Sequence, residues 1–311
     1  MKTLHLGVIL FLSIILIGVF ISSTSPIEAL PEYITGNKVK TGVRLLNVDN
    51  IDIVKNSYTL DFYIWFDWNP EQFTAQQIKD FEFLNGFPNK NIVFESEDGF
   101  IQYRVRGDFI KTFDFSRYPF ETHKLGVVIE HNNLNSTALV YELDPDSSID
   151  KNVNVIGWNI KGFSTLVEDH SFSDNNMSNF SFELTVERPF YSSFAKNVLP
   201  LIIITLIALL TFFISPANNA RIGFAVSSLL TVSALHISLL SALPPTGYLT
   251  LSDGMMLIVY IIFFYILAVS VWLMKLIDQK RVDDAAKFNS DAWKMLSVLI
   301  FLMIMALFVI F

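Results

Sequence analysis

The sequence predicts an exported all-β sandwich of immunoglobulin-like architecture, followed by an α-helical bundle of four transmembrane helices. Three observations predict this fold class. Hydrophobic residues make up 52% of the 311-residue chain and cluster rather than spread evenly. Four apolar runs in the C-terminal part are long enough to cross a bilayer. The part before them alternates apolar and polar residues with period two, as half-buried strands do.

The N-terminus is predicted to be a secretory signal peptide. An apolar run from Leu6 to Ile21 follows Lys2, and small residues precede a cleavage site near Ala29. An uncleaved membrane anchor is the alternative. The chain then divides into three predicted segments: a signal peptide (1–29), a β-sandwich domain (30–190) and a transmembrane domain (191–311).

Strands are indicated by alternation in several short segments. In "TLDFYIWFDW" every second residue from Leu60 to Trp68 is apolar, and these residues share one face. Similar alternation occurs at 101–105, 125–129 and 180–186, and Asp98-Gly99 predicts a hairpin turn. Short strands at this spacing are typical of a β-sandwich.

The four membrane spans are predicted at about residues 194–214, 220–243, 255–274 and 293–311. The link between the third and fourth spans carries five basic residues, whereas the link between the second and third carries no lysine or arginine. The positive-inside rule therefore places the former in the cytoplasm, and the sandwich and the C-terminus on the other side. The sequence predicts a multi-pass cell-membrane protein with an extracellular or periplasmic sandwich.

Composition narrows the function classes. Cysteine is absent, which excludes disulfides and thiolate chemistry. Residues 1–190 hold 15 basic and 25 acidic residues, a difference of −10, whereas residues 191–311 hold 7 and 5, a difference of +2. The acidic exported half argues against nucleic acid as a partner. No GxSxG, HExxH, Walker or GxGxxG pattern stands in a suitable context, so we predict no enzyme activity, cofactor or metal site.

The loop "FDFSRYPFETHKL" at 113–125 is apolar although it connects two predicted strands. It resembles the signature loop of the pentameric ligand-gated ion channels (the Cys-loop superfamily) in the cysteine-free prokaryotic form. The family's order of elements follows over 39–311, with Arg188-Pro189 before the first span and Pro200 near its start. One departure is the loop-A segment, which is not recognisable between Asp67 and Ile92. The residues that carry the loop resemblance are Asp114, Arg117, Tyr118, Pro119, Phe120 and Glu121.

The second span has one stripe of residues at steps of three and four. A conduction path needs several copies around an axis, hence a cyclic homo-oligomer, and the resemblance implies a pentamer. Leu230 and Ile237 would then form a hydrophobic gate. Close packing of a small-residue helix against its neighbours is the alternative. The predicted pore-lining residues are Gly223, Ser227, Leu230, Ala234, Ile237 and Ser241.

The predicted pore mouth consists of Asn219, Ala220 and Arg221. It lacks the acidic ring usual in cation-selective members, and "ARIGFAVSSLLT" resembles the second span of the anion-selective receptors. We therefore predict anion selectivity. A cation-selective channel of the same family remains an alternative, because an acidic sandwich would concentrate cations. A non-conducting receptor whose sandwich binds a ligand is the second alternative.

The resemblance also implies a gating interface and an agonist pocket. Charged residues of the signature loop would meet Arg188 and the external loop at Pro244-Pro245, with a solvated ion-pair cluster as the alternative. The implied agonist is a small molecule or a proton, and Tyr63 is equally consistent with surface packing. The implied ligand-binding residues are Tyr63, Arg104, Arg106, Glu130, His131 and Phe172.

Three histidines of the sandwich invite a proton-gating role because histidine titrates near neutral pH. We predict that His123, His131 and His170 are ordinary surface residues. His236, inside the second span, is predicted to hydrogen-bond a neighbouring helix as a neutral ring.

Overall fold

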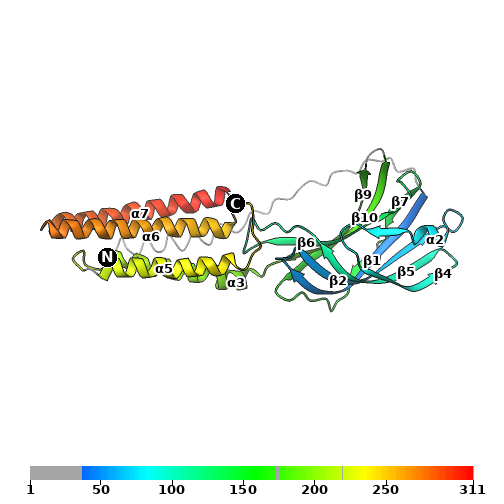
Figure 1. The fold of residues 1–311 in the computed structure, drawn as a ribbon, viewed down its shortest axis with the longest axis horizontal. Helices are drawn as coiled ribbons and strands as arrows, with labels where there is room; N and C mark the ends of the chain where they lie inside the picture. Colours follow the sequence, from blue (N-terminus) through cyan, green and yellow to red (C-terminus); the bar gives the residue numbers. More distant parts are fainter. Residues whose placement is uncertain (1–36, 173–174, 219, 311) are drawn as a thin grey trace. The chain divides into compact units, whose positions relative to one another are not determined.

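The computed structural model describes residues 37–172, 175–218 and 220–310 (Figure 1). The predicted signal peptide lies outside the described residues. The described chain begins with β-strands arranged in two sheets and continues with four helices that are long and apolar enough to cross a membrane. The predicted fold class, a β-sandwich followed by four transmembrane helices, is confirmed.

The first sheet has the strand order β4-β5-β2-β1-β7, with β8 pairing β1. β7 and β8 run parallel to β1, and the other pairs are antiparallel. The predicted hairpin turn joins β4 to β5, and Gly99 there has φ +88°, a conformation that glycine adopts without strain. The strands are β1 (Asn37–Asp52), β2 (Ser57–Trp68), β4 (Asn89–Ser96), β5 (Phe100–Ile110), β7 (Leu139–Leu143) and β8 (Ser148–Ile149).

The second sheet has the order β3-β6-β10-β9. Its strands are β3 (Phe81–Phe83), β6 (Thr122–His131), β9 (Asn159–Phe172) and β10 (Asn175–Glu187). β3 and the short helix α2 (Ala75–Ile78) occupy the segment in which no loop-A motif was recognisable. Thr74 caps α2 reciprocally with Gln77, which explains how four residues hold a helical turn.

The core between the sheets is rich in aromatic side chains from both. Phe66 and Phe81 lie 4.8 Å apart between ring centroids, and Phe62 and Phe83 meet edge to face at 6.2 Å. The Tyr58 hydroxyl on β2 accepts a hydrogen bond from the Gly126 N–H on β6 at 3.0 Å. This hydroxyl ties the two sheets together by a buried polar contact.

The first membrane helix runs over Phe190–Phe213 as α3 (Phe190–Ser193), η1 (Phe194–Val198), α4 (Leu199–Leu209) and η2 (Leu210–Phe213). The widened turn η1 immediately precedes Pro200. Proline has no N–H to donate, so the helix loses one hydrogen bond there and adjusts its winding.

The other membrane helices are α5 (Ala220–Leu240), α6 (Leu251–Asp278) and α7 (Val282–Ile310). All four predicted spans are present, but α6 and α7 are longer than predicted. The charged link expected between the third and fourth spans shortens to residues 279–281. The polar stretch after it is helical because Ala285, Ala292 and Leu296 bury one face against the bundle.

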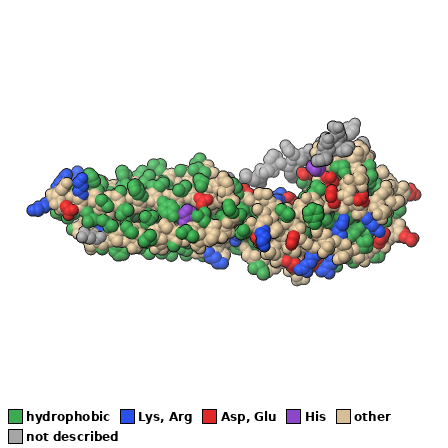
Figure 2. Space-filling view, viewed as in Figure 1, with side chains coloured by type: hydrophobic (Ala, Val, Ile, Leu, Met, Phe, Trp, Pro, Cys, Tyr) green, Lys and Arg blue, Asp and Glu red, His purple; other side chains and the backbone are tan. Residues whose placement is uncertain are grey.

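Hydrophobic side chains cover the visible face of these helices, whereas charged side chains gather over the strands (Figure 2). Large apolar residues such as Phe264 and Val298 are mostly exposed on the helices. Exposed apolar surface on long helices is what a lipid environment requires. The chain is a multi-pass membrane protein with an N-terminal β-sandwich domain.

Candidate pore helix and gating junction

The predicted pore-lining stripe lies on an exposed face of α5. Leu230 and Ile237 are 67% and 69% exposed, and the other members of the stripe are exposed as well. Ser241 lies one residue beyond the end of the helix. The opposite face, with Val232 and Leu239, is buried where α5 packs against α4 and α6.

At the other end of α5, Arg221, which is predicted for the pore mouth, does not share this exposed stripe. It is 2% exposed and donates to the Ile214 carbonyl at 2.7 Å and to Asn289 Oδ1 at 2.8 Å. The side chain reaches back into the subunit because carbonyl and amide acceptors are available there. Ala220 is exposed, and Asn219 lies outside the described residues.

A junction forms where the signature loop meets the start of α6. The Ser116 carbonyl accepts from the Leu251 N–H at 2.8 Å, and the Tyr118 carbonyl accepts from the Ser252 N–H at 3.1 Å. The first N–H groups of a helix have no partner within it. The loop therefore supplies acceptors that the first turn of α6 lacks, and the two segments are held together by backbone hydrogen bonds.

Further contacts at the junction come from Tyr248, whose hydroxyl accepts from the Phe115 N–H at 2.8 Å. Pro244 and Pro245, predicted as loop partners, lie earlier in the same connection. The hydrogen bonds to the loop come from Tyr248 and the start of α6. Hydrogen bonds from the Ser116 N–H and hydroxyl lower the pKa of Asp114, so this carboxylate is held in its charged form.

An ion pair between Glu121 and Arg188 lies beside these contacts. The Arg188 Nε donates to Glu121 Oε1, and the Glu121 carboxylate is 1% exposed. The guanidinium of Arg188 lies 4.6 Å from the centroid of the Trp158 ring. Phe120 stacks on Phe190 at 5.1 Å, while the Arg117 side chain is exposed. The predicted proximity of Glu121 and Arg188 is confirmed.

His123 is the main residue that the sequence reasoning misplaced. It is 5% exposed and lies in a cage of aromatic rings, with centroid distances of 4.8 Å to Phe113, 5.7 Å to Phe115 and 5.3 Å to Trp158. Its Nε2 has no hydrogen-bond partner among the described residues. Burial, and then the positive charge of Arg188, lower its pKa to about 4. His123 is thus a buried neutral imidazole, and the prediction of a surface residue was wrong.

Three of the predicted agonist residues lie on the first sheet. Asp61, which is buried, accepts from Arg104 Nε at 3.2 Å and from its Nη2 at 2.9 Å. The Arg104 guanidinium lies 5.9 Å from the Tyr63 ring, and Arg106 pairs with Asp49 at 2.7 Å. The three side chains form a polar surface on the outer face of β2 and β5.

The remaining agonist candidates lie on the second sheet. Glu130 on β6 contacts His170 Nδ1 on β9 at 2.9 Å, and His170 is exposed as predicted. His131 is 3% exposed, so its predicted surface position was wrong. Phe172 is the last residue of β9, and its side chain is not described.

The buried His131 makes hydrogen bonds with both ring nitrogens. Its Nε2 lies 2.8 Å from the Gln77 carbonyl, and its Nδ1 accepts from the backbone N–H groups of Asn133 and Leu134. These hydrogen bonds fix the orientation of the ring at the end of β6.

His236 on α5 contacts the hydroxyl of Tyr260 on α6, with 3.0 Å between Nδ1 and the oxygen. The predicted hydrogen bond to a neighbouring helix is confirmed. It gives α5 a polar link to the helix whose first turn binds the signature loop.

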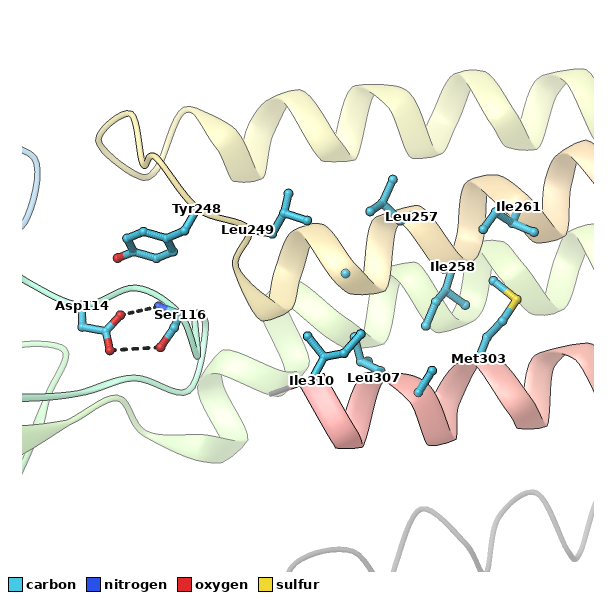
Figure 3. A pocket seen from close by; sticks show the side chains of 12 residues that line it. Asp114, Ser116, Tyr248, Leu249, Leu257, Ile258, Ile261, Met303, Leu307 and Ile310 are labelled. Carbon is cyan, nitrogen blue, oxygen red and sulfur yellow. Dashed lines mark hydrogen bonds between the residues drawn. The ribbon is translucent and has the colours of Figure 1, made fainter.

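A groove of about 610 Å³ opens between α6 and α7 next to the junction. Figure 3 shows Asp114, Ser116 and Tyr248 at one end, and apolar side chains of the two helices along its length. Because its walls are apolar away from the junction, the groove suits hydrocarbon rather than a polar ligand. Its apolar lining consists of Leu249, Leu257, Ile258, Ile261, Met303, Ala306, Leu307 and Ile310.

Comparison with curated proteins finds a protein of Gloeobacter violaceus named "Proton-gated ion channel". It is 23% identical to this chain over 252 residues, which cover 73% of this chain and 70% of the relative. No protein-family model matches the chain. The similarity agrees with the resemblance carried by the signature loop.

Proposed function

We propose that this chain forms a homopentameric ion channel of the pentameric ligand-gated family, which its signature loop resembles and which its similarity to the Gloeobacter protein supports. The exposed stripe of α5 lines its pore, and a signal received by the outer sandwich opens it. The relative's name supports protons as that signal. The observation that carries the proposal is the exposure of Leu230 and Ile237 on a helix whose opposite face is buried.

The stripe combines small residues with two large apolar ones. Leu230 and Ile237 are seven residues apart, about 10 Å along a helix. Five copies of each would form two apolar rings two turns apart, and such constrictions close a pore by expelling water. Gly223 and Ser227, below the rings, leave the inner part of the pore wider.

Anions are the proposed permeating ions. The described residues of the α4–α5 connection and the first turn of α5 carry no acid, and Arg221 supplies a positive charge there. A charge at the mouth acts on a passing ion at short range, whereas charges in an outer vestibule are screened beyond about 8 Å at physiological salt.

Gating is proposed to run from the junction to α5. The signature loop binds the first turn of α6 through Leu251 and Ser252, and α6 is linked to α5 by Tyr260 and His236. A displacement of the loop would therefore move the helix that packs against the pore helix. The Glu121–Arg188 pair would keep the loop and the start of the first membrane helix together during that movement.

The agonist site is proposed to lie between neighbouring subunits. Within one chain the candidates occupy two different sheets, so only a neighbouring copy can bring both groups to one pocket. The residues proposed for this site are Tyr63, Arg104, Arg106, Glu130, His131 and Phe172.

The test of the proposed function is the current carried by the Leu230→Ala variant without agonist. Shrinking a hydrophobic gate admits water, so we expect a standing current in this variant and none in the parent at neutral pH. Leu229→Ala is the matched control, because Leu229 is one residue away and packs against the bundle core. Reversal potentials in two chloride concentrations give the sign of the permeating ion.

Surface labelling should verify that each protein reaches the membrane. A Leu230→Ala variant that carries no current at normal surface density would overturn the pore assignment of α5 and favour a non-conducting receptor. A reversal potential that follows sodium would keep the channel and overturn the anion assignment.

A further inference from the structure

Three segments meet around the Asn289 side chain at the inner end of the helix bundle. Asn289 Oδ1 on α7 accepts from Arg221 Nη2 on α5 at 2.8 Å, and Asn289 Nδ2 donates to the Phe212 carbonyl of η2 at 3.0 Å. Arg221 Nη1 donates to the Ile214 carbonyl at 2.7 Å. One amide thus binds both the end of the first membrane helix and the beginning of the pore helix.

The acceptors around Arg221 are all neutral. They are the Ile214 carbonyl and the Asn289 amide oxygen, while Arg221 Nε has no partner among the described residues. The Phe212 ring lies 5.9 Å from the guanidinium. Within the part of the chain that the structure describes, no carboxylate forms an ion pair with Arg221.

Buried arginines are ordinarily paired with a carboxylate, because an isolated charge is costly to remove from water. Neutral acceptors repay part of that cost without cancelling the charge. A unit positive charge in low-dielectric surroundings acts over a longer distance than the same charge in water. Five such charges would surround the inner mouth of a pentamer.

We propose that Asn289 is a positioning residue for ion selectivity: its amide fixes the Arg221 guanidinium behind the first turn of α5 and, being uncharged, leaves the full positive charge to act on permeating ions. The inference rests on the proposed pore function. It adds that α7, the last membrane helix, contributes to ion selectivity through the hydrogen-bonded side chain of Asn289.

The experiment compares the Asn289→Asp variant with the parent. Aspartate is nearly isosteric with asparagine and can still accept from Arg221, but it cancels the charge that the amide leaves uncompensated. We expect the ratio of chloride to sodium permeability to fall by about tenfold or more. The protein should still assemble, because the new pair replaces the hydrogen bond.

Ser290→Asp is the matched control. Ser290 is the next residue of α7 and is exposed, so its variant adds the same charge to the same helix without facing Arg221. We expect its permeability ratio to stay within about twofold of the parent, because exposed charges are strongly screened. Asn289→Leu, which removes both hydrogen bonds but adds no charge, should lower single-channel conductance and leave the permeating ion an anion.

The outcomes separate this inference from the function on which it rests. A parent that does not conduct overturns the channel and the inference together, and a sodium-selective parent overturns the anion assignment and the role of Arg221. An anion-selective parent with an unchanged ratio in Asn289→Asp overturns only the inference. An equal shift in Asn289→Asp and Ser290→Asp also overturns it, because the effect would then belong to the added charge and not to the contact with Arg221.

Discussion

Replacing His123 by glutamine should remove a large part of the stability that the protein loses at low pH. The imidazole is buried among three aromatic rings, and its pKa is lowered to about 4 by burial and by Arg188. Among the other charged groups that face it, Lys111 acts in the same direction as Arg188, and Asp114 acts against them. The folded state therefore favours the neutral ring, and a proton bound to His123 favours any state in which the ring reaches water.

The size of the effect follows from linkage between protonation and folding. An unperturbed histidine has a pKa near 6.5, so the shift to about 4 is worth about 3 kcal/mol per subunit when fully expressed. This contribution is fully present above pH 6.5. It is lost as the pH falls from about 6.5 to about 4, because the unfolded state then binds a proton that the folded state does not.

The assay is thermal unfolding of the purified protein in detergent between pH 7.5 and pH 4.5. Other groups titrate over this range, so the quantity that matters is the difference between parent and His123→Gln at each pH. On acidification, we expect the free energy of unfolding of the variant to gain about 2 to 3 kcal/mol relative to that of the parent. His170→Gln is the control, because it removes an imidazole at an exposed position and leaves the aromatic cage around His123 intact.

A constant difference between parent and His123→Gln across the pH range would refute the reasoning. It would mean that the imidazole is not held neutral by its surroundings. The same linkage has a functional consequence, because a ring released to water binds protons about 300-fold more tightly than the buried ring. Acid activation, where it occurs, should then need a lower pH in His123→Gln than in the parent.

Two further predictions concern the contacts that hold the sandwich and the junction. Glu121→Gln leaves Arg188 without its carboxylate. We expect the free energy of unfolding to fall by about 2 kcal/mol, and the response to agonist to weaken at normal surface density. The control is Glu142→Gln, which breaks an exposed pair with Lys38 and should change the free energy of unfolding by less than about 0.5 kcal/mol. Tyr58→Phe leaves the Gly126 N–H without its hydroxyl acceptor and should lower thermal stability by about 1 to 3 kcal/mol, whereas an unchanged melting temperature would contradict the role assigned to that hydroxyl.

Much of the sandwich could be predicted from the sequence, because a one-sided strand repeats its burial every second residue. The same alternation predicts that the His123 side chain is buried. It stands at even spacing from Leu125, Val127 and Ile129, all of which are buried, so the alternation places its side chain inside. The prediction of a surface residue followed the polarity of histidine instead of the period of the strand.

The bundle was predicted less completely, because partners within it come from distant parts of the chain. The exposed stripe of α5 follows from helical spacing alone. The burial of Arg221 depends on Asn289, which lies 68 residues later in a segment that was read as a polar link. Local sequence marks neither residue as a contact, and the periodic burial of Ala285 and Ala292 is the signal that could have extended α7 over this segment.

The acidic sandwich favours cations, whereas the basic mouth favours anions. The length of the pore helix indicates which of these charges sets the ion selectivity. α5 has 21 residues, which span about 30 Å at 1.5 Å per residue. Arg221 lies in its first turn, so the mouth is separated from the outer end of the helix by about four screening lengths at physiological salt. The excess acid of the sandwich can concentrate cations outside the pore, but it is screened at the inner end. Selectivity should therefore follow the charge that acts at the mouth, which is why a single added carboxylate beside Arg221 is expected to outweigh the ten excess acids of residues 1–190.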